Sequence, residues 1–550
     1  MKEPAHPKPL RFLVIGAGSR GTAYGRAVTA ATTGTIHAVA EPHAFQRDEF
    51  GRNFIWGDAA PKPGQSFADW KDWLAWEQSR RDQNHPEGEE GEVGVDGVFI
   101  CTLDETHVDI LLAIAPLNLH ILCEKPLALS LRDCLSVYRA LAPQTVNDDN
   151  NNDTTQQGKI FSIGHVLRYS PHNILLRQLL LVDKAIGDIV SLEHCEPVGW
   201  WHFSHSYVRG NWRRETATGD GSLLTKSCHD IDFIMWLLSS PAPSSSSTSQ
   251  IPTRVHHPRT ITSSGALTQF RQARKPPAAG SATNCLSCPA EPECNYSAVK
   301  IYRDMHTAKG WYDWPVKIVC PDIEDVARSA SDSASAKEAA SRHLLQKLEE
   351  DYTPETADEA IAARPWYGRC VYESDNSVCD DQVVTITWDD EEQESPGGQG
   401  QEEDERNLRP AKTAVFHMIA PTEKQCERRG RVYGTHGELS YDSRTITIYS
   451  FATRTSRVVE VPRQPPEEER SHGGGDYGLA RSFVRAVDAV ENGAMGVEEA
   501  QRGFVGCTLE EAVRSHAVVF AAEEARREER VVRWKEWWEK ALASAATPLS

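Results

Sequence analysis

A lysine at the end of an apolar segment is the first residue of this chain that is placed for acid–base chemistry. The segment LHILCEKP covers 119–126, and its apolar run stops at Glu124 and Lys125, directly before Pro126. The proline fixes its own φ and restricts the residue before it, so the lysine has a restricted backbone. We expect its ammonium to face a cleft and to exchange a proton with a ligand hydroxyl. Alternatively, Lys125 pairs with Glu124 or extends along the surface.

Three glycines have the spacing of a dinucleotide-binding turn. In LVIGAGSRG, Gly16, Gly18 and Gly21 directly follow an apolar run, and Glu41 ends the second such run. This context predicts a tight turn, a close approach of pyrophosphate to backbone N–H groups, and a helix packed on a strand. A carboxylate accepts hydrogen bonds from ribose hydroxyls and repels a 2′-phosphate, so Glu41 favours NAD(H) over NADP(H). Arg47 weakens that preference, and a packing turn without cofactor is the alternative.

A further strand-like segment ends in CTLDETH at 101–107. Thr102 is expected at the carboxyl end of a strand, and Asp104 is expected to cap the next helix. His107 either approaches the cofactor or is structural. The predicted cofactor-binding residues are Gly16, Gly18, Ser19, Arg20, Gly21, Glu41, Thr102, His107, Glu124 and Lys125.

The segment GSLLTKSCHDIDFIMWLL at 221–238 holds a second candidate for proton transfer. His229, Asp232, Phe233 and Trp236 have helical spacing, so the helix is expected to lean its polar first turn into a cleft. His229 is the candidate acid or base. The alternative is a core histidine satisfied by Asp232 or by the backbone.

An aromatic and basic segment is the best candidate for contacts to a substrate. GWWHFSHSYVRGNWRR at 199–214 combines rings that suit the C–H faces of a sugar with groups that bind hydroxyls or an acid. The alternative is an interdomain strap with packed tryptophans. The predicted substrate-binding residues here and in GHVLRYSP at 164–171 are Arg168, Tyr169, Trp201, His205, Arg209 and Trp212.

Three cysteines have a spacing that is compatible with a metal. Cys285, Cys288 and Cys294 form C-x2-C-x5-C, which needs a fourth ligand such as Cys370 or His306 to hold zinc. Reduced cysteines or one disulfide explain the pattern equally well, so we predict no metal.

The order of apolar segments predicts the fold that positions these groups. Apolar runs at 12–15, 36–40, 95–101, 119–123 and 160–163 alternate with helical segments such as 106–115, which is typical of a doubly wound Rossmann domain. Alternating segments at 189–194, 382–388, 412–419, 430–441, 444–450 and 455–461 predict a large, mostly antiparallel open sheet. Thr508 and Glu511 predict a capping box. We expect an α/β chain with a dinucleotide-binding domain at 1–165 and a second α/β domain for substrate binding and oligomerisation at 166–550. A surface insertion is expected at 145–158, and flexible loops or linkers are expected at 239–252, 326–350 and 389–405.

Composition limits the partners. The 550 residues carry a formal charge of −20, of which the runs at 87–92 and 389–405 supply thirteen. An acidic chain binds polyanions poorly, so nucleic acid and anionic membranes are not expected as partners. No long apolar run is present near the start or elsewhere, which predicts a cytoplasmic protein with reduced thiols.

Taken together, these motifs resemble the Gfo/Idh/MocA family of NAD(P)-dependent oxidoreductases. The resemblance rests on GAGSRG, Glu41, CTLDETH, CEKP, GHVLRYSP and the CHDID helix over roughly 10–240, and on GTHGELSYD and HGGGDYGLARSFVRAV later in the chain. It implies a catalytic Lys125, an active-site His229, a sugar-like or cyclitol substrate and an open sheet that often serves oligomerisation. Many members have an aspartate four residues before the histidine, where this chain has Thr225. Lys226 follows and is expected to contact substrate.

The resemblance leaves three functions open. The leading hypothesis is hydride transfer between NAD(H) and a secondary alcohol or carbonyl, with NADP(H) less favoured. Some related proteins keep a tightly bound NAD and hydrolyse glycosides without net oxidation, and one is a non-catalytic regulator that binds dinucleotide. Phrases such as HFSHSYVRGNWRR, KSCHDID and YGRCVY indicate a less-studied branch, so no substrate follows from the resemblance.

Overall fold

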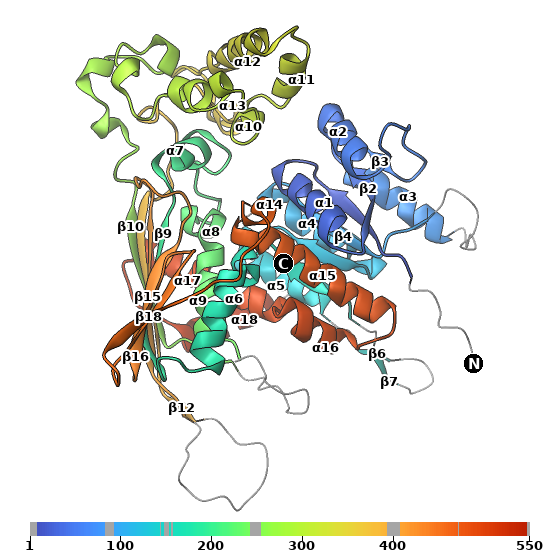
Figure 1. The fold of residues 1–550 in the computed structure, drawn as a ribbon, viewed down its shortest axis with the longest axis vertical. Coiled ribbons are helices and arrows are strands. Elements are labelled where there is room, and N and C mark those ends of the chain that lie inside the picture. Colours follow the sequence, from blue (N-terminus) through green and yellow to red (C-terminus); the bar gives the residue numbers. More distant parts are fainter. Residues whose placement is uncertain are drawn as a thin grey trace, which may run out of the picture.

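The computed structural model describes residues 8–82, 93–142, 145–147, 153–155, 158–241, 255–392, 408–470 and 472–546. Within these residues the chain forms two large sheets side by side, with a group of short helices above the second (Figure 1). No helix in the described part is long and apolar enough to cross a membrane.

The N-terminal sheet is parallel and has the order β3-β2-β1-β4-β5-β8. It confirms the predicted Rossmann domain. The strands β1, β4 and β5 are almost wholly buried, which explains their continuous apolar sequences. The strands are β1 Arg11–Ile15, β2 Thr35–Ala40, β3 Ser66–Phe67, β4 Gly97–Ile100, β5 His120–Cys123 and β8 Phe161–Ile163. The helices of this part are α1 Ser19–Ala31, α2 Ala44–Phe54, α3 Trp70–Asp82, α4 His107–Ile114 and α5 Leu131–Leu141.

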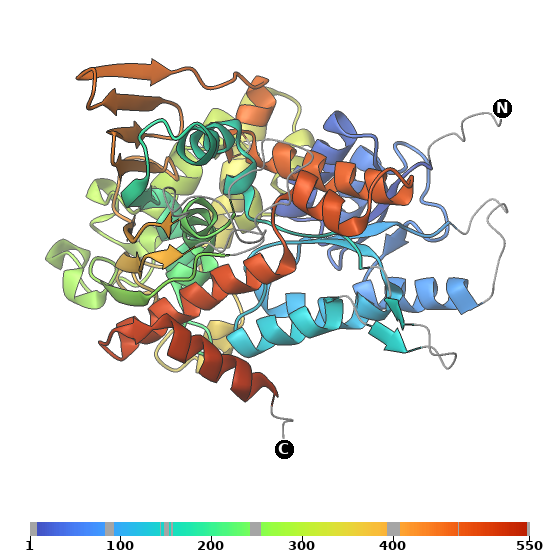
Figure 2. The ribbon, with the colours of Figure 1, turned by 90° about the horizontal axis from the view of Figure 1, so that it is seen from below.

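The chain returns to the Rossmann sheet near its C-terminal end. Helix α15 (Gly475–Glu491) packs against α1, and Phe483 places its ring 5.8 Å from that of Phe12 and 5.3 Å from that of Phe99. Figure 2 shows α15 lying over the N-terminal helices, while α17 (Leu509–Arg527) runs beside α5. The predicted domain boundary at 165/166 stays a prediction. Helix α15, which lies far beyond that boundary in the sequence, completes the core of the first domain.

The second sheet has nine strands in the order β18-β17-β16-β15-β9-β14-β11-β10-β19. It is mostly antiparallel, as predicted, although β9 and β14 run parallel. The segment 430–441 is two strands rather than one, and β10 and β19 were not anticipated. The strands are β9 Ile189–Pro197, β10 Thr260–Ala266, β11 Asp381–Trp388, β14 Lys412–Ile419, β15 Arg429–Gly434, β16 Gly437–Tyr441, β17 Ile446–Ser450, β18 Thr455–Val459 and β19 Val532–Arg533.

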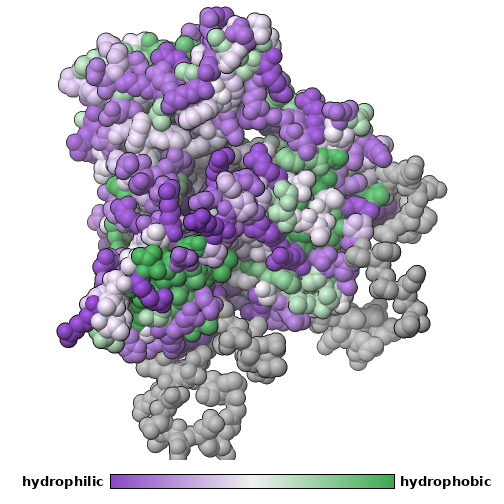
Figure 3. Space-filling view, viewed as in Figure 1, coloured by the Kyte–Doolittle hydropathy of each residue, from purple (hydrophilic) through white to green (hydrophobic). Residues whose placement is uncertain are grey.

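Helices cover one face of this sheet and separate it from the Rossmann domain (Figure 1). Strands β11 and β14 alternate buried and partly exposed residues, as expected for a sheet with one covered face. Figure 3 shows an apolar area on the lower part of this domain. The exposed apolar side chains of the domain include Ile174, Val190 and Val458. The α-helices that follow β8, apart from those of the helical insertion, are α6 Pro171–Arg177, α7 Trp200–Phe203, α8 Ser222–Thr225, α9 Cys228–Leu238, α14 Pro466–Glu469, α15, α16 Val497–Ala500, α17 and α18 Trp534–Ala546. The capping box of Thr508 and Glu511 at the start of α17 is confirmed.

The segment 326–350 was predicted as a loop, and that prediction is wrong. It contains α12 (Ser333–Leu348), capped by Asp332 through the N–H groups of Ala334 and Ser335. Leu344 and Leu348 are fully buried in a second, small apolar core formed by the helical insertion. The serine and alanine content concealed a leucine pair at helical spacing, and alanine itself favours helix. The other insertion helices are α10 Val316–Val319, α11 Ile323–Arg328 and α13 Asp358–Ala362.

The remaining predicted insertions fall largely outside the described residues. Two short hairpins mark the described ends of two of them, and most of 239–252 lies outside. The hairpin strands are β6 Thr145–Asn147 with β7 Asp153–Thr155, and β12 Glu391–Glu392 with β13 Leu408–Arg409.

Candidate active site

Gly16 and Gly18 lie in the turn between β1 and α1, Gly21 lies in the first turn of α1, and each has different steric surroundings. Gly16 has φ +91°, and a Cβ there would lie 2.6 Å from the carbonyl oxygen of Cys101. A Cβ on Gly21 would lie 2.0 Å from the carbonyl oxygen of Gly16, whereas a Cβ on Gly18 would have no neighbour within 4 Å. Gly16 and Gly21 are thus required by close packing, and Gly18 leaves open space at the start of α1. This arrangement fits a pyrophosphate that approaches the backbone at Gly18.

Glu41 is buried at the carboxyl end of β2 and holds the glycine turn. Its carboxylate accepts hydrogen bonds from the backbone N–H groups of Ala17 and His43, both at 2.8 Å. Arg47 donates to the carbonyl oxygen of Glu41 at 2.6 Å, so its guanidinium is fixed beside the same strand end. Each carboxylate oxygen still has a second lone pair for a ribose hydroxyl.

Arg20 and Glu124 are bound to each other, which changes the role expected for them. Arg20 Nε donates to Glu124 Oε1 at 2.8 Å, and its Nη2 donates to Asp476 of α15 at 2.8 Å. Tyr24 also donates to Glu124, at 2.6 Å. Although burial alone would raise the pKa of Glu124, Arg20 and the Tyr24 hydroxyl lower it below its usual value. The polar atoms of this pair thus join α1, β5 and α15, and cofactor binding by Arg20 or Glu124 stays a prediction. Ser19 is exposed at the start of α1.

Thr102 and His107 hold the two loops at the sheet edge together. His107 is fully buried, with Nδ1 2.8 Å from the carbonyl oxygen of Pro126 and Nε2 3.3 Å from that of Thr102. These contacts favour the structural role for His107 over contact with a cofactor, because both ring nitrogens face backbone carbonyls. Thr102 accepts a hydrogen bond from Thr106 at 2.7 Å.

Lys125 follows β5 and crosses to the second domain. Its Nζ donates to the backbone carbonyl of Thr225 at 2.6 Å and lies 5.9 Å from the centre of the Trp212 ring. The Trp212 indole in turn donates to Asp104 at 2.9 Å. Among the described residues, the ammonium thus donates to a neutral carbonyl, and the oxygens of Glu124 bind other groups. The fold thus brings Lys125, Trp212 and Asp104 together, and the carboxylate of Asp104 accepts a hydrogen bond from the Trp212 indole.

His229 lies in the first turn of α9, four residues after the Thr225 that binds Lys125, and no described residue binds either of its ring nitrogens. It is only 6% exposed, and the carboxylate of Asp230 is 3.9 Å away, too far for a hydrogen bond. Burial, together with the charges of Lys125 and Arg428, lowers the pKa of His229 well below its usual value. His229 is therefore a neutral imidazole with two unused polar atoms. Thr225, four residues earlier, donates its hydroxyl to the carbonyl of Gly221 and leaves the imidazole unpolarised.

A second buried histidine also lacks hydrogen-bond partners for its ring nitrogens among the described residues. His165 is fully buried and neither of its nitrogens has a described partner. Burial is the main reason that its pKa falls to about 3, with His516, Arg168 and Lys125 adding to the effect. Sequence reasoning missed His165, although it lies in the GHVLRYSP segment that drew attention to Arg168.

A buried ionic network lies behind His229. Arg428 donates to Glu196 at 2.6 Å and to both carboxylate oxygens of Asp230 at 2.9 and 3.0 Å. Lys226 lies 3.3 Å from Glu196. Glu196, His229 and Asp230 also have ligand atoms within 4.8 Å of one another, the geometry of a potential metal site. Because Arg428 and Lys226 already neutralise the two carboxylates, the donor set does not suit a divalent cation, and we assign none.

Two of the predicted substrate contacts are structural. Arg168 forms a bidentate ion pair with Asp232 at 2.7 and 2.8 Å and donates to the carbonyl of Gly506 at 3.1 Å. Tyr169 donates to the carbonyl of Val505 at 2.9 Å. Both side chains are buried with their donors used. We therefore correct the prediction that they reach the cleft.

Three more predicted contacts hold the helical insertion. Trp201 packs its ring 5.1 Å from that of Trp314, and His205 hydrogen-bonds the Tyr302 hydroxyl at 2.9 Å. Arg209 is fully buried and donates to the carbonyls of Arg369 and Tyr296 at 2.6 and 2.7 Å. These contacts favour the alternative of a structural strap, and substrate binding by the three residues stays a prediction. Trp212 of the same segment has its ring 5.9 Å from Lys125 Nζ.

The cysteines of the C-x2-C-x5-C pattern in the same insertion are free thiols. All thirteen cysteines are free, which excludes the disulfide. The backbone of Cys285 pairs with Gly368 and that of Cys370 with Thr283, so Cys370 lies near Cys285. Among described residues, the set Glu196, His229 and Asp230 alone has three potential ligand atoms within 4.8 Å of one another, so these thiols are not gathered into a metal site.

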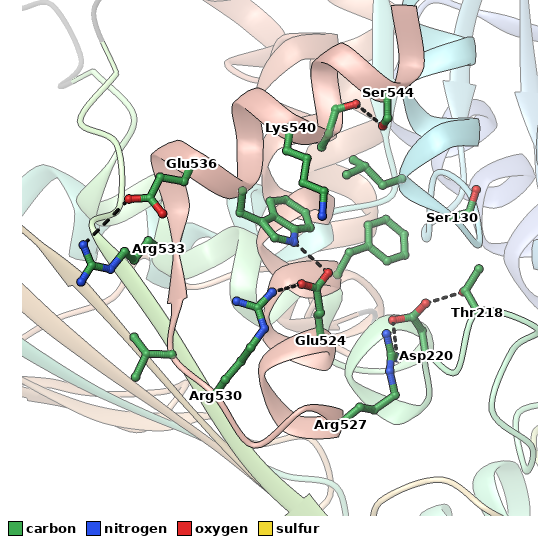
Figure 4. Close-up of a pocket in the computed structure, with 15 residues that line it drawn as sticks. Ser130, Thr218, Asp220, Glu524, Arg527, Arg530, Arg533, Glu536, Lys540 and Ser544 are labelled. Atoms are coloured by element: carbon green, nitrogen blue, oxygen red, sulfur yellow. Dashed lines mark hydrogen bonds and ion pairs between the residues drawn. The ribbon is translucent and has the colours of Figure 1, made fainter. Parts of the chain in front are cut away.

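A surface pocket apart from this site has a volume of about 660 Å³ and lies between α5, α17 and α18 (Figure 4). Its lining contains neither Lys125 nor His229, and ion pairs such as Arg530 with Glu524 and Arg533 with Glu536 use its charged groups. We therefore base the functional argument on the sheet edge.

Comparison with known proteins agrees with this geometry. Residues 10–147 match the family described as "Oxidoreductase family, NAD-binding Rossmann fold", and 180–272 match "Oxidoreductase family, C-terminal alpha/beta domain", the two domains of Gfo/Idh/MocA proteins. The chain therefore carries the NAD-binding Rossmann domain and the C-terminal α/β domain of the Gfo/Idh/MocA oxidoreductase family.

Named relatives are distant and only partly covered. The 2,7-anhydro-N-acetylneuraminate hydratase of Escherichia coli K12 is 26% identical over 144 residues, which is 26% of this chain and 34% of the relative. Inositol 2-dehydrogenase 2 of Paenarthrobacter aurescens is 27% identical over 147 residues, 27% of this chain and 38% of the relative. The chain thus spans little more than a third of the length of these relatives.

Solved structures match the fold over most of the chain. An inositol dehydrogenase homologue from Azotobacter vinelandii, complexed with NAD+, has a TM-score of 0.55 at 12% identity, covering 96% of this chain and 98% of its own. Levoglucosan dehydrogenase, in complex with NADH and levoglucosan, has a TM-score of 0.53 at 15% identity, covering 96% and 100%. At these identities the likeness shows the fold alone.

Proposed function

We propose that the chain is an NAD(H)-dependent oxidoreductase that transfers a hydride to or from a secondary alcohol or carbonyl of a sugar, a cyclitol or a related small molecule. The observation that carries this proposal is that the ammonium of Lys125 reaches the carbonyl of Thr225, four residues before His229, whose buried imidazole has both nitrogens free. Lys125 follows β5 at the strand edge that also bears the glycine turn, and its charge lowers the pKa of His229. Such an edge is where ligands of doubly wound sheets bind.

The residues present fit a dinucleotide. The open space at Gly18 suits the pyrophosphate at the start of α1, and Glu41 offers acceptor lone pairs for the adenosine ribose. NAD(H) is favoured over NADP(H) because the Glu41 carboxylate repels a 2′-phosphate. When bound, the nicotinamide supplies or accepts the hydride.

The chain's own residues supply the proton chemistry. Lys125 Nζ binds the reacting hydroxyl or carbonyl oxygen and exchanges its proton with it. His229, which is neutral because burial and two nearby cations lower its pKa, accepts a hydrogen bond from the same or the adjacent hydroxyl. Trp212 offers an apolar face beside the lysine for the C–H side of a ring. Lys226 and the open sheet remain proposed for substrate contact and for homo-oligomer formation.

Two measurements on purified protein test the proposal. Denaturing extraction followed by mass spectrometry identifies any dinucleotide that co-purifies, and absorbance at 340 nm follows NAD+ reduction with myo-inositol, levoglucosan and common aldoses. Net NADH formation with at least one polyol supports the proposal. A bound NAD that is never released as NADH, combined with product formation, would instead indicate a redox-neutral reaction.

A further inference from the structure

Cys426 lies in a cluster of polar side chains that neither the sequence motifs nor the proposed reaction uses. Its Sγ is 3.1 Å from Lys226 Nζ and 3.4 Å from His202 Nδ1. Lys226 is the residue directly after Thr225, whose carbonyl binds Lys125. The cysteine is partly exposed, and its backbone has φ +57°. The thiol is therefore beside the candidate active site and held against a cation.

We propose that Cys426 is a modification site, a thiolate ion-paired with Lys226 that reacts with small electrophiles such as hydrogen peroxide and haloacetamides. In the reaction with peroxide, the thiolate sulfur attacks one oxygen, the S–O bond forms as the O–O bond breaks, and the leaving hydroxide takes a proton from the Lys226 ammonium and departs as water; solvent then reprotonates Lys226. The product is a sulfenic acid. In the reaction with iodoacetamide, the S–C bond forms as the C–I bond breaks and iodide leaves.

The charges around the thiol favour its ionised form. Burial alone would raise the pKa of Cys426, but Lys226 and Arg428 overcome that effect and bring the pKa below the ordinary value. Burial likewise opposes the charge of Lys226, whose pKa is nonetheless raised by Cys426 and Glu196. The other groups that face the thiol come from three elements: the neutral His202 of α7, Glu196 of β9, and His472 before α15. A cation in direct contact with sulfur is the arrangement that makes cysteines reactive.

The chain contains a matched control. Cys195 on β9 is also partly exposed, but burial raises the pKa of its thiol and no described side chain donates a hydrogen bond to its sulfur. Both cysteines can be quantified in one sample by peptide mass spectrometry. Reagent and protein concentrations are then the same for both.

The test is the rate of iodoacetamide labelling of each cysteine as a function of pH in the full-length protein. We expect Cys426 to be labelled at least tenfold faster than Cys195 at pH 7, with a lower pH midpoint. Lys226→Met should slow labelling of Cys426 by about tenfold or more, since loss of a neighbouring cation raises a pKa by 1–3 units. Lys226→Arg should retain the fast rate. Peroxide followed by dimedone should label Cys426 before Cys195.

Equal rates for the two cysteines in the wild-type protein would overturn the proposal, whether or not the variants fold. So would fast labelling of Cys426 that is unchanged in a folded Lys226→Met protein. Neither measurement requires the enzyme's substrate, so failure here is separate from failure of the proposed reaction.

Discussion

Alanine substitutions at Gly18 and Gly21 should separate cofactor binding from folding. Each adds the same methyl group, but the protein leaves room for it at Gly18 and not at Gly21. A Cβ on Gly21 would lie 2.0 Å from the Gly16 carbonyl oxygen and 3.2 Å from a methyl group of Val14. Ordinary contact needs about 3.4 Å, so α1 must move by more than 1 Å from β1. Overpacking of this size costs about 3 kcal/mol. A domain of 150–250 residues loses roughly 2–4 °C of Tm per kcal/mol, so Gly21→Ala should lower the Tm by about 6–12 °C.

Gly18→Ala should behave differently. A Cβ there meets nothing within 4 Å, and the backbone at φ −71° is open to any residue. The change from glycine to alanine before a helix costs at most about 1 kcal/mol. The methyl group would, however, stand where the pyrophosphate approaches, so the Kd for NADH should rise by about tenfold or more. Differential scanning fluorimetry and titration of NADH fluorescence measure the two effects. Wild-type NADH affinity in Gly18→Ala would refute the placement of the dinucleotide at this turn.

Three other predictions concern stability. Leu344→Ala should lower the unfolding free energy of the helical insertion by about 2–5 kcal/mol because Leu344 is fully buried there, and limited proteolysis would detect the exposed α12; unchanged protease resistance would contradict the packing. Asp232→Asn should destabilise the protein by about 3–5 kcal/mol because it leaves Arg168 as a buried, unpaired charge, and chemical denaturation would measure the loss; no change would mean that the ion pair is not formed. The pKa values of His165 and His516 fall to about 3 and about 4 in the folded protein, below the unfolded value near 6.5, so their contribution to stability is complete above pH 6.5 and is lost as the pH falls. The Tm of His165→Gln should therefore decline less steeply between pH 6.5 and 5 than the Tm of the wild-type protein. An unchanged decline would contradict this.

The sequence predicted the Rossmann half closely because its signals are local. Each apolar run at 12–15, 36–40 and 119–123 fills a buried parallel strand, and the glycine spacing determines which strand bears the cofactor turn. The alternation in 382–388 and 412–419 likewise predicted strands with one covered face. These patterns depend on neighbours a few residues apart and so are visible in one sequence.

The site was harder to predict because its partners are distant in the chain. Lys125 and Thr225 are 100 residues apart, and Cys426 and Lys226 are 200 apart, with no pattern to link them. Residue type alone also misled: Arg168 suits an acidic ligand, but its guanidinium is used by Asp232 of α9. A polar side chain's role depends on whether the fold has already satisfied it, which the sequence does not record.

The claim that Lys125 exchanges the proton during hydride transfer is tested most directly by Lys125→Met, assayed at 340 nm with the polyol that the wild-type protein oxidises fastest. Methionine keeps the bulk of the stem and removes the ammonium, so kcat should fall by about 10²- to 10⁴-fold while the Kd for NADH stays within about twofold. Lys125→Arg is the matched control: it keeps the charge near the Thr225 carbonyl but does not release a proton near neutral pH, so it should be slow as well. Near-normal turnover in a folded Lys125→Met protein would contradict the account and leave Lys125 as a link between the two domains.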